Sequence, residues 1–169
     1  SAEFDWVDLG DTLRTASVSL LPETTQKSID LRMEGEEKLP TVMADRNKLL
    51  QLFQNILGNA VHAVPEWGHI TIRTRCLLHE SQPAVEVRIE DDGPGISPQN
   101  ADKVFEPFFT TSARGTGLGL AIVRRIVDQH GGRVYLDATV TQGTTLIVLL
   151  PLTQGAQDDQ GTLKQTSVS

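Results

Sequence analysis

The sequence predicts an α+β fold, a two-layer sandwich in which helices cover one face of a mixed β-sheet. Two segments, 45–64 and 117–132, have the apolar periodicity of amphipathic helices. Three others, 69–76, 84–91 and 144–152, have the alternating or apolar pattern of strands. Helices and strands do not alternate regularly along the chain, which disfavours the doubly wound folds built from repeated βαβ units.

Local signals place the remaining elements. Asp45 is the expected N-cap of helix 45–64, and Gly131 is the expected C-terminal cap of helix 117–132. The other expected elements are, in chain order, a helix (8–28), two short strands (29–34 and 39–45), a polar loop (77–83) and a strand (133–138) that forms a hairpin with 144–152.

Length and composition indicate one domain with a short tail. The chain has 169 residues, of which 38% are hydrophobic and 22% charged, as in ordinary globular proteins. Residues from 154 onward lack apolar periodicity and are expected to be disordered. The expected organisation is therefore a domain over 1–152 and a tail over 153–169.

The charge of the chain disfavours several classes of partner. A net charge of −7 repels nucleic acids and anionic membrane surfaces, so we expect neither to contact this domain. An anionic ligand would need local attraction from backbone N–H groups, a metal ion or a few arginines. The single cysteine excludes an internal disulfide. No stretch reaches the ~20 apolar residues of a membrane span and no signal peptide is present, so the expected location is cytoplasmic.

Helix 45–64 has an unusual polar stripe. Its members fall within an arc of roughly 80° and are Lys48, Gln51, Asn55, Asn59 and His62. Any helix beside water has a polar face, but asparagine is a poorer helix former than the Glu, Lys or Arg usual there. An asparagine carbonyl is a hard oxygen ligand suited to Mg²⁺, which takes few protein ligands and otherwise binds phosphate and water. A solvated face and a metal site both remain open.

Asp91 ends the alternating strand 84–91. Val85, Val87 and Ile89 form its apolar row, and Asp91 continues that row inward. An aspartate before glycine often only caps its own turn, but Asp92 already supplies that turn chemistry. A carboxylate directed inward needs hydrogen-bond donors, and the exocyclic amine of adenine is one suitable ligand group.

A second glycine cluster, Gly115, Gly117 and Gly119, begins helix 117–132. Glycines allow a ligand to approach the backbone closely, and a helix N-terminus favours anions. No apolar strand precedes the cluster, which argues against a dinucleotide-binding turn, and the P-loop pattern is absent. The cluster therefore indicates another kind of phosphate site.

The asparagine stripe, "DDGPG", "FEPFF" and "GTGLGL" occur in that order, and the sequence thereby resembles the ATP-binding catalytic domain of bacterial sensor histidine kinases, most closely the nitrogen-regulatory type. This is the Bergerat fold, shared with gyrase-type topoisomerases, a heat-shock chaperone and mismatch-repair ATPases. The likeness extends from about Phe4 to Pro151. It implies that the chain binds ATP and Mg²⁺.

The resemblance also implies residue roles. Asn59 would ligate Mg²⁺, Asn55 would lie beside the phosphates as the catalytic asparagine, and Asp91 would accept the adenine amine. Phe105 and Phe108 would anchor a lid over the nucleotide. The remaining expected nucleotide contacts are Gly93, Gly95 and Ile96 near the base; Gly115, Thr116, Gly117, Leu118 and Gly119 near the phosphates; and Thr145 near adenine and Asp91.

Two positions depart from the family pattern. His62 stands where relatives often have Lys or Arg, and Ser112 stands where they often have Lys. Phosphate contact is therefore expected to depend more on Arg114. His62 is still counted in the site. None of the four histidines has the sequence context of a phosphoacceptor. His130, before two glycines at a helix end, is expected to have a capping or surface role.

The resemblance therefore implies a protein-histidine kinase catalytic domain without its substrate helix. It would transfer the γ-phosphoryl of Mg–ATP to a histidine on a separate dimerisation domain of the same kinase and would act indirectly on a response regulator. It could form the cytoplasmic part of a membrane-bound sensor. One alternative is an ATP-operated clamp. It would need an additional transducer domain, for which the chain has no room. Another is a non-catalytic nucleotide-sensing or partner-switching module of the same fold.

Overall fold

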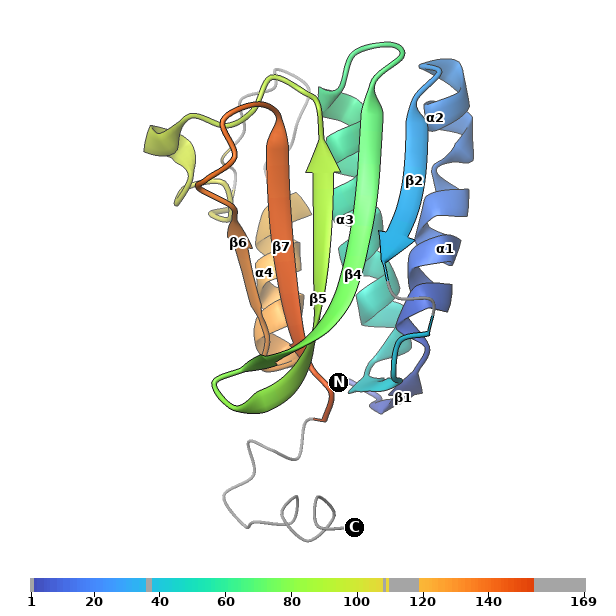
Figure 1. The fold of residues 1–169 in the computed structure, drawn as a ribbon, viewed down its shortest axis with the longest axis vertical. Helices are drawn as coiled ribbons and strands as arrows, with labels where there is room; N and C mark the ends of the chain where they lie inside the picture. Colours follow the sequence, from blue (N-terminus) through green and yellow to red (C-terminus); the bar gives the residue numbers. More distant parts are fainter. Residues whose placement is uncertain (1, 36–37, 108, 110–118, 154–169) are drawn as a thin grey trace, which may run out of the picture.

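The protein has two layers, a five-stranded mixed sheet and a set of helices that covers one face of it (Figure 1). A computed structural model describes residues 2–35, 38–107, 109 and 119–153. The predicted α+β architecture is confirmed. Apart from its first residue, the predicted tail lies outside the described residues.

The main sheet contains one parallel pair, and its other neighbouring strands are antiparallel. Its strand order is β2 (Asp30–Gly35), β4 (His69–His79), β5 (Gln82–Asp91), β7 (Thr144–Pro151) and β6 (Arg133–Leu136). The parallel pair is β2 with β4, and the helix α3 (Arg46–Ala63) lies between these strands in the sequence. A separate antiparallel pair joins β1 (Asp5–Val7) to β3 (Val42–Ala44), and β1 was not expected from the sequence.

The helices mostly follow the predicted bounds. They are α1 (Leu9–Ser19), α2 (Leu21–Gln26), α3 (Arg46–Ala63) and α4 (Gly119–Gln129), with a 3-10 turn at Pro98–Asn100. The single helix predicted over 8–28 is wrong, because Pro22 in the first turn of α2 has no N–H to continue the bonds of α1. The Asp45 cap is confirmed, since its carboxylate accepts from the N–H of Lys48 at 3.1 Å. Gly131 has the positive φ of 69° expected of a C-terminal cap.

The polar loop predicted over 77–83 is instead a tight hairpin. β4 continues to His79 and β5 begins at Gln82, so only Glu80 and Ser81 form the turn. Both have positive φ, 51° and 66°, as in the turns that match the twist of paired strands. The prediction failed because Pro83 and two adjacent leucines interrupt the alternation that marks a strand.

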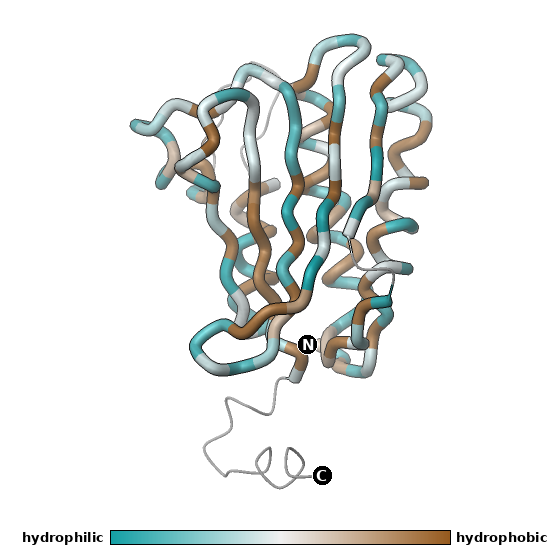
Figure 2. Tube along the Cα trace, viewed as in Figure 1, coloured by the Kyte–Doolittle hydropathy of each residue, from teal (hydrophilic) through white to brown (hydrophobic). Residues whose placement is uncertain are grey.

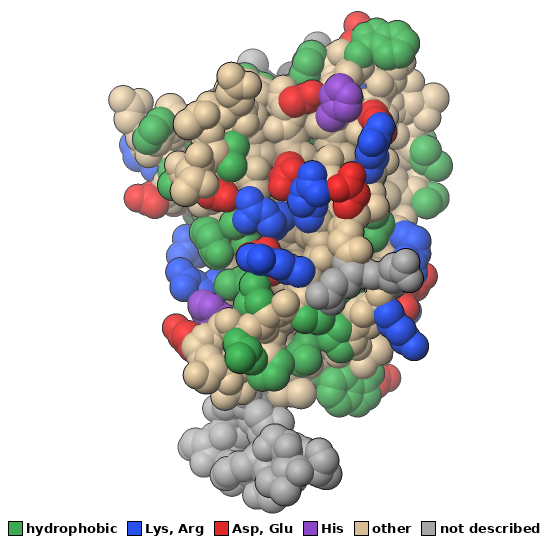
Figure 3. All heavy atoms as spheres, viewed as in Figure 1, with side chains coloured by type: hydrophobic (Ala, Val, Ile, Leu, Met, Phe, Trp, Pro, Cys, Tyr) green, Lys and Arg blue, Asp and Glu red, His purple; other side chains and the backbone are tan. Residues whose placement is uncertain are grey.

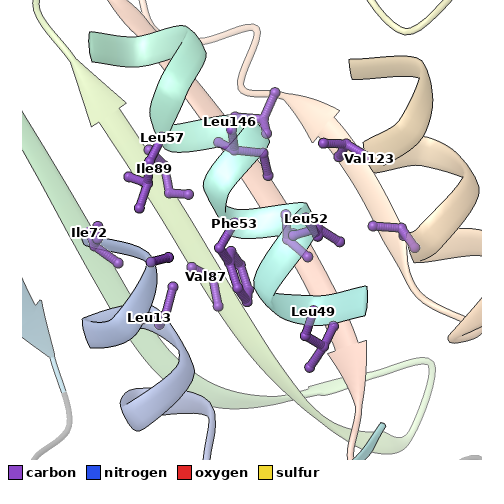
Figure 4. Close-up of a cluster of buried hydrophobic side chains, with 14 of the residues drawn as sticks. Leu13, Leu49, Leu52, Phe53, Leu57, Ile72, Val87, Ile89, Val123 and Leu146 are labelled. Carbon is purple, nitrogen blue, oxygen red and sulfur yellow. The ribbon is translucent and has the colours of Figure 1, made fainter. Parts of the chain in front are cut away.

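The hydrophobic core lies between the sheet and the helices. Figure 4 shows side chains of α1, α3 and α4 meeting those of the strands, with Phe53 of α3 at the centre. The predicted inward row of β5 is confirmed, because Val85, Val87 and Ile89 are almost fully buried. Hydrophobic segments alternate with polar ones along the strands, as expected for a sheet with one face on the core (Figure 2).

Charged side chains gather across the middle of the opposite face of the sheet, with hydrophobic side chains below them in the view (Figure 3). Arg75 bonds Glu86 at 2.8 Å, and Arg88 bonds Asp137 at 2.8 Å. Hydrogen bonds from Thr139 and from Arg88 lower the pKa of Asp137 to about 2. The charged side chains of this face thus pair with one another. Among the described residues, no helix combines the length and the apolar character needed to cross a bilayer.

His130 connects three parts of the chain at the end of α4. Its ring is 1% exposed. Nδ1 donates to the carbonyl of Ile126 at 2.8 Å, and Nε2 accepts from the backbone N–H of Asp45 at 3.0 Å. The ring also contacts Phe4, with centroids 4.9 Å apart. The expected capping role is therefore present, but the expected surface position is wrong.

This arrangement requires the neutral tautomer with its proton on Nδ1. Protonation at Nε2 would direct a second donor at the N–H of Asp45. Burial lowers the pKa of His130, against smaller opposing effects of the Ile126 carbonyl and the Asp45 carboxylate, while the charge of Lys48 lowers it further. The unfolded chain then binds more protons than the folded chain at mildly acidic pH, so stability falls as pH falls below ~6.5.

We predict that the H130Q variant loses this pH dependence. Gln cannot reproduce both ring contacts, so unfolding free energy at pH 7.5 should fall by about 1–3 kcal/mol. The difference between wild type and variant should shrink as the pH is lowered from 7.5 to 5.5, as measured by urea unfolding. H79Q, in the β4–β5 hairpin, serves as the control and should keep the wild-type pH profile. A constant difference across that range would contradict the assignment of a neutral His130.

Candidate nucleotide-binding site

Asp91 lies at the end of the central strand β5, between β4 and β7. Its register partners are Ile70 and Thr144. The carboxylate is half-buried, and Oδ1 accepts from the N–H of Gly93 at 2.8 Å. Burial raises its pKa, as does the neighbouring charge of Asp92, and hydrogen bonds from the backbone of Gly93 and Thr144 oppose the shift. The ionised form is thus short of donors, and a ligand amine would supply one.

The C-terminal end of α3 lies beside this carboxylate. A Cβ added to Gly93 would lie 3.0 Å from Oδ1 of Asp91 and 3.2 Å from the carbonyl oxygen of Ala63. Ala63 is one helical turn beyond Asn59 and two turns beyond Asn55. Asn59 and then Asn55 therefore lie at increasing distance from Asp91 along α3.

Close backbone contacts fix the turn that follows Asp91. A Cβ on Gly143 would lie only 2.0 Å from the carbonyl oxygen of Asp91, and Gly143 has φ of 71°. A Cβ on Gly95, which has φ of 83°, would lie 2.9 Å from the carbonyl oxygen of Gly143. Both positions require glycine. Gly95, expected to allow close approach of a ligand, is needed already for approach of this neighbouring backbone.

The strand register corrects the expectation for Thr145. Thr145 pairs with Glu90, and Thr144 pairs with Asp91. Residues directly opposite one another in antiparallel strands share a face of the sheet. Thr145 therefore lies on the face of the sheet away from the helices, where it is buried, and Thr144 occupies the place beside Asp91. The motif was read one residue too far along the strand.

Asn55 and Asn59 lie on the polar side of α3. Asn55 is half-buried, and its Nδ2 is buried without a hydrogen-bond partner in the structure as described. Asn59 is exposed, and a Cβ added to Gly119 at the start of α4 would lie 3.7 Å from its Oδ1. The start of α4 therefore faces Asn59 of α3. A buried amide that lacks an acceptor is the kind of group that a phosphate oxygen satisfies.

These residues also fit a magnesium ion. Among the described residues there is no group of three or more His, Cys, Asp or Glu side chains placed to share a metal. Mg²⁺ needs only one or two protein oxygens when it is held largely by phosphates and water. The exposed carbonyl of Asn59, close to a helix N-terminus that favours anions, matches that arrangement.

The other expected site residues differ in how they are placed. Phe105 is buried in the core, and Arg124 of α4 lies over its ring at 5.8 Å from the centroid. Ile96 is partly buried against the core, and His62 is exposed in the last turn of α3. Six expected contacts lie outside the described residues: Phe108, Arg114, Gly115, Thr116, Gly117 and Leu118.

Lys27 was not expected from the sequence to support the site. Its Nζ donates to the carbonyl of Val61 at 2.9 Å and lies 3.3 Å from that of His62. These carbonyls end α3 and lack partners within the helix. Lys27 thus satisfies the end of the helix nearest Asp91. A lysine 34 residues away in sequence from Val61 carries no local signal of this contact.

The fold and these residues define an ATPase-type domain, and comparison with known proteins identifies its family. Residues 44–154 match the HATPase_c family, described as histidine kinase-, DNA gyrase B-, and HSP90-like ATPase. The chain belongs to this family.

Relatives of the chain are sensor histidine kinases. Sensor histidine kinase ZraS of Escherichia coli K12 is 34% identical over 155 residues, which cover 92% of this chain and 32% of ZraS. The catalytic domain of histidine kinase ThkA has a TM-score of 0.82 at 32% identity, covering 92% of this chain and 99% of that domain. Full-length ShkA in complex with AMPPNP has a TM-score of 0.78 at 30% identity, covering 89% of this chain and 31% of ShkA. This chain thus carries the catalytic domain of protein-histidine kinases, and it spans about a third of ZraS.

We predict that G143A destabilises the domain strongly. The added methyl would collide with the carbonyl of Asp91 and would need a positive φ, at a cost of about 2–4 kcal/mol. G58A is the matched control, because a Cβ there meets nothing within 4 Å and lies inside helix α3. It should stabilise by about 0.5–1 kcal/mol. Equal unfolding midpoints for G143A and wild type in urea would contradict the close contact.

Proposed function

We propose that this chain binds Mg–ATP and transfers the γ-phosphoryl to a histidine on a separate dimerisation domain. The observation that carries the proposal is the half-buried, donor-poor carboxylate of Asp91 next to the end of α3. Adenine would donate its amine to Asp91, and the phosphates would extend along α3 toward Asn59 and Asn55. The membership of the chain in the kinase-type ATPase family supports this order.

The proposed chemistry consists mainly of positioning. Mg²⁺, when bound, neutralises charge on the phosphates. Asn59 would hold the metal through its side-chain carbonyl, and the Asn55 amide would donate to a phosphate oxygen. The N-terminus of α4 would favour the same anion. Asn55 is a poor general base because an amide has no useful basicity, so any base would come from the acceptor domain.

The partners follow from what the chain lacks. None of its four histidines stands in the sequence context of a phosphoacceptor, so the acceptor would be a dimerisation domain of the same kinase. A response regulator would receive the phosphoryl group afterwards. We place this domain in the cytoplasm, where ATP and such regulators are available.

We predict that D91N separates binding from stability. Folding raises the pKa of Asp91, so its contribution to stability is present at acidic pH and is lost as pH rises through the folded pKa. Removing the charge should therefore leave the melting temperature at pH 7 unchanged or higher. ADP affinity should fall about 10- to 100-fold, because the acceptor of the adenine amine is lost.

Calorimetric titration of ADP into wild type, D91N and the control D128N, on the exposed side of α4, checks both expectations. D128N should bind as wild type does. Wild-type affinity in D91N would remove Asp91 from the adenine site, and absence of ADP binding by the wild type would contradict the proposed function as a whole.

We predict that N59A loses the metal-dependent part of binding. ADP affinity without Mg²⁺ should stay within about threefold of wild type, and the gain on adding Mg²⁺ should fall roughly tenfold. Phosphorylation of an added acceptor domain should fall in parallel, as measured with radiolabelled ATP. If the wild type binds Mg–ATP but never phosphorylates any matched acceptor domain, the chain is a nucleotide-sensing module instead.

A further inference from the structure

A second aspartate is anchored directly beside the proposed adenine acceptor. Asp92 Oδ1 accepts from the backbone N–H of His69 at 2.8 Å, and Oδ2 lies 2.8 Å from Nδ1 of the same histidine. The backbone N–H of Asp92 donates to the carbonyl of His69 at 3.3 Å. One residue at the start of β4 thus makes three contacts with the residue that follows β5.

These contacts continue the pairing of β4 and β5 past its last register pair. That pair is Ile70 with Asp91, after which β5 ends. The turn before β4 also fits closely around Asp92, since a Cβ added to Gly68 would lie 2.9 Å from Oδ1. Asp91 is therefore held between a strand on one side and an anchored neighbour on the other.

The contacts with His69 also give the adjacent carboxylates of Asp91 and Asp92 different roles. Either could accept from the Gly93 N–H or from a ligand amine if both were free to turn. His69 occupies both oxygens of Asp92, and its hydrogen bonds lower the pKa of Asp92 in spite of the opposing effect of burial. Asp92 is thereby held against β4, and Asp91 is the inward-facing carboxylate that can accept from a ligand.

We propose that Asp92 and His69 form a positioning pair that fixes the direction of the Asp91 carboxylate and thereby sets the preference of the site for adenine over guanine nucleotides. This inference rests on the proposed function. Guanine carries a carbonyl oxygen where adenine carries its amine, so a correctly directed carboxylate accepts from the first base and repels the second. A poorly directed carboxylate discriminates less.

The test is the ratio of ADP to GDP affinity, measured by calorimetry with Mg²⁺ on the 169-residue chain. D92A should lower this ratio roughly 3- to 10-fold, mainly by weakening ADP. D92N should recover most of it, because its amide still offers an acceptor to the His69 N–H and a polar partner to the ring. D128A is the control: it removes an exposed carboxylate on α4 and should leave the ratio unchanged.

A merely structural role would reduce the binding-competent fraction and would weaken the binding of ADP and GDP equally. An unchanged affinity ratio in D92A would therefore contradict the proposed positioning role of Asp92 and His69. H69A tests the same pair from the other side if D92A does not fold, and H69A/D92A should be no less selective than either single variant. A wild type that does not distinguish ADP from GDP would instead remove Asp91 as the adenine acceptor, and the pair with it. That failure is seen in the wild type alone.

Discussion

The architecture of this domain depends on one constraint: a carboxylate at the end of a central strand has to be supplied with donors. Asp91 lies between β4 and β7, where burial raises its pKa. Among the described residues, backbone N–H groups of the turn and of Thr144 offset that cost. For those groups to come close, β7 must approach so nearly that Gly143 has no room for a side chain. The glycines here are required first by the neighbouring backbone.

The two helices of the candidate site approach each other at both ends, through different residues. At one end, the buried ring of His130 from α4 accepts from the N–H of Asp45, which caps α3. At the other end, Asn59 faces the first residue of α4. A nucleotide bound there would lie between elements whose relative position is already fixed by contacts that it does not touch. The incoming N-terminal segment contributes to the first of these ends, through Phe4 on His130 and through the N–H of Glu3 on the Asp45 carboxylate.

Periodicity predicted the helices, the inward row of β5 and the layer arrangement, because these follow from burying one face of each element. It could not predict contacts between distant segments, such as Lys27 at the end of α3 or His130 with Asp45. The Thr145 assignment shows a sharper limit. A register shift of one residue moves a side chain to the other face of the sheet, and the motif alone does not fix the register. Asn55 and Asn59 were identified from their spacing, but only the structure shows that the amide of Asn55 lacks a partner.

Among the described residues, the proposed site offers a highly charged ligand few cations, and Arg114, the expected phosphate contact, lies outside them. The chain carries a net charge of −7, and the one lysine near the described site, Lys27, donates to the carbonyls that end α3. Amide donors, a helix N-terminus and a metal held by few protein atoms therefore have to offset the charge of the phosphates. Such neutral donors orient the phosphates but attract them only weakly at long range. Affinity would therefore depend on the metal and on the fit of the base. Under the proposed function, such a site would position its nucleotide through directional contacts, which suits a donor that must present its phosphoryl group to a second domain and then release the product.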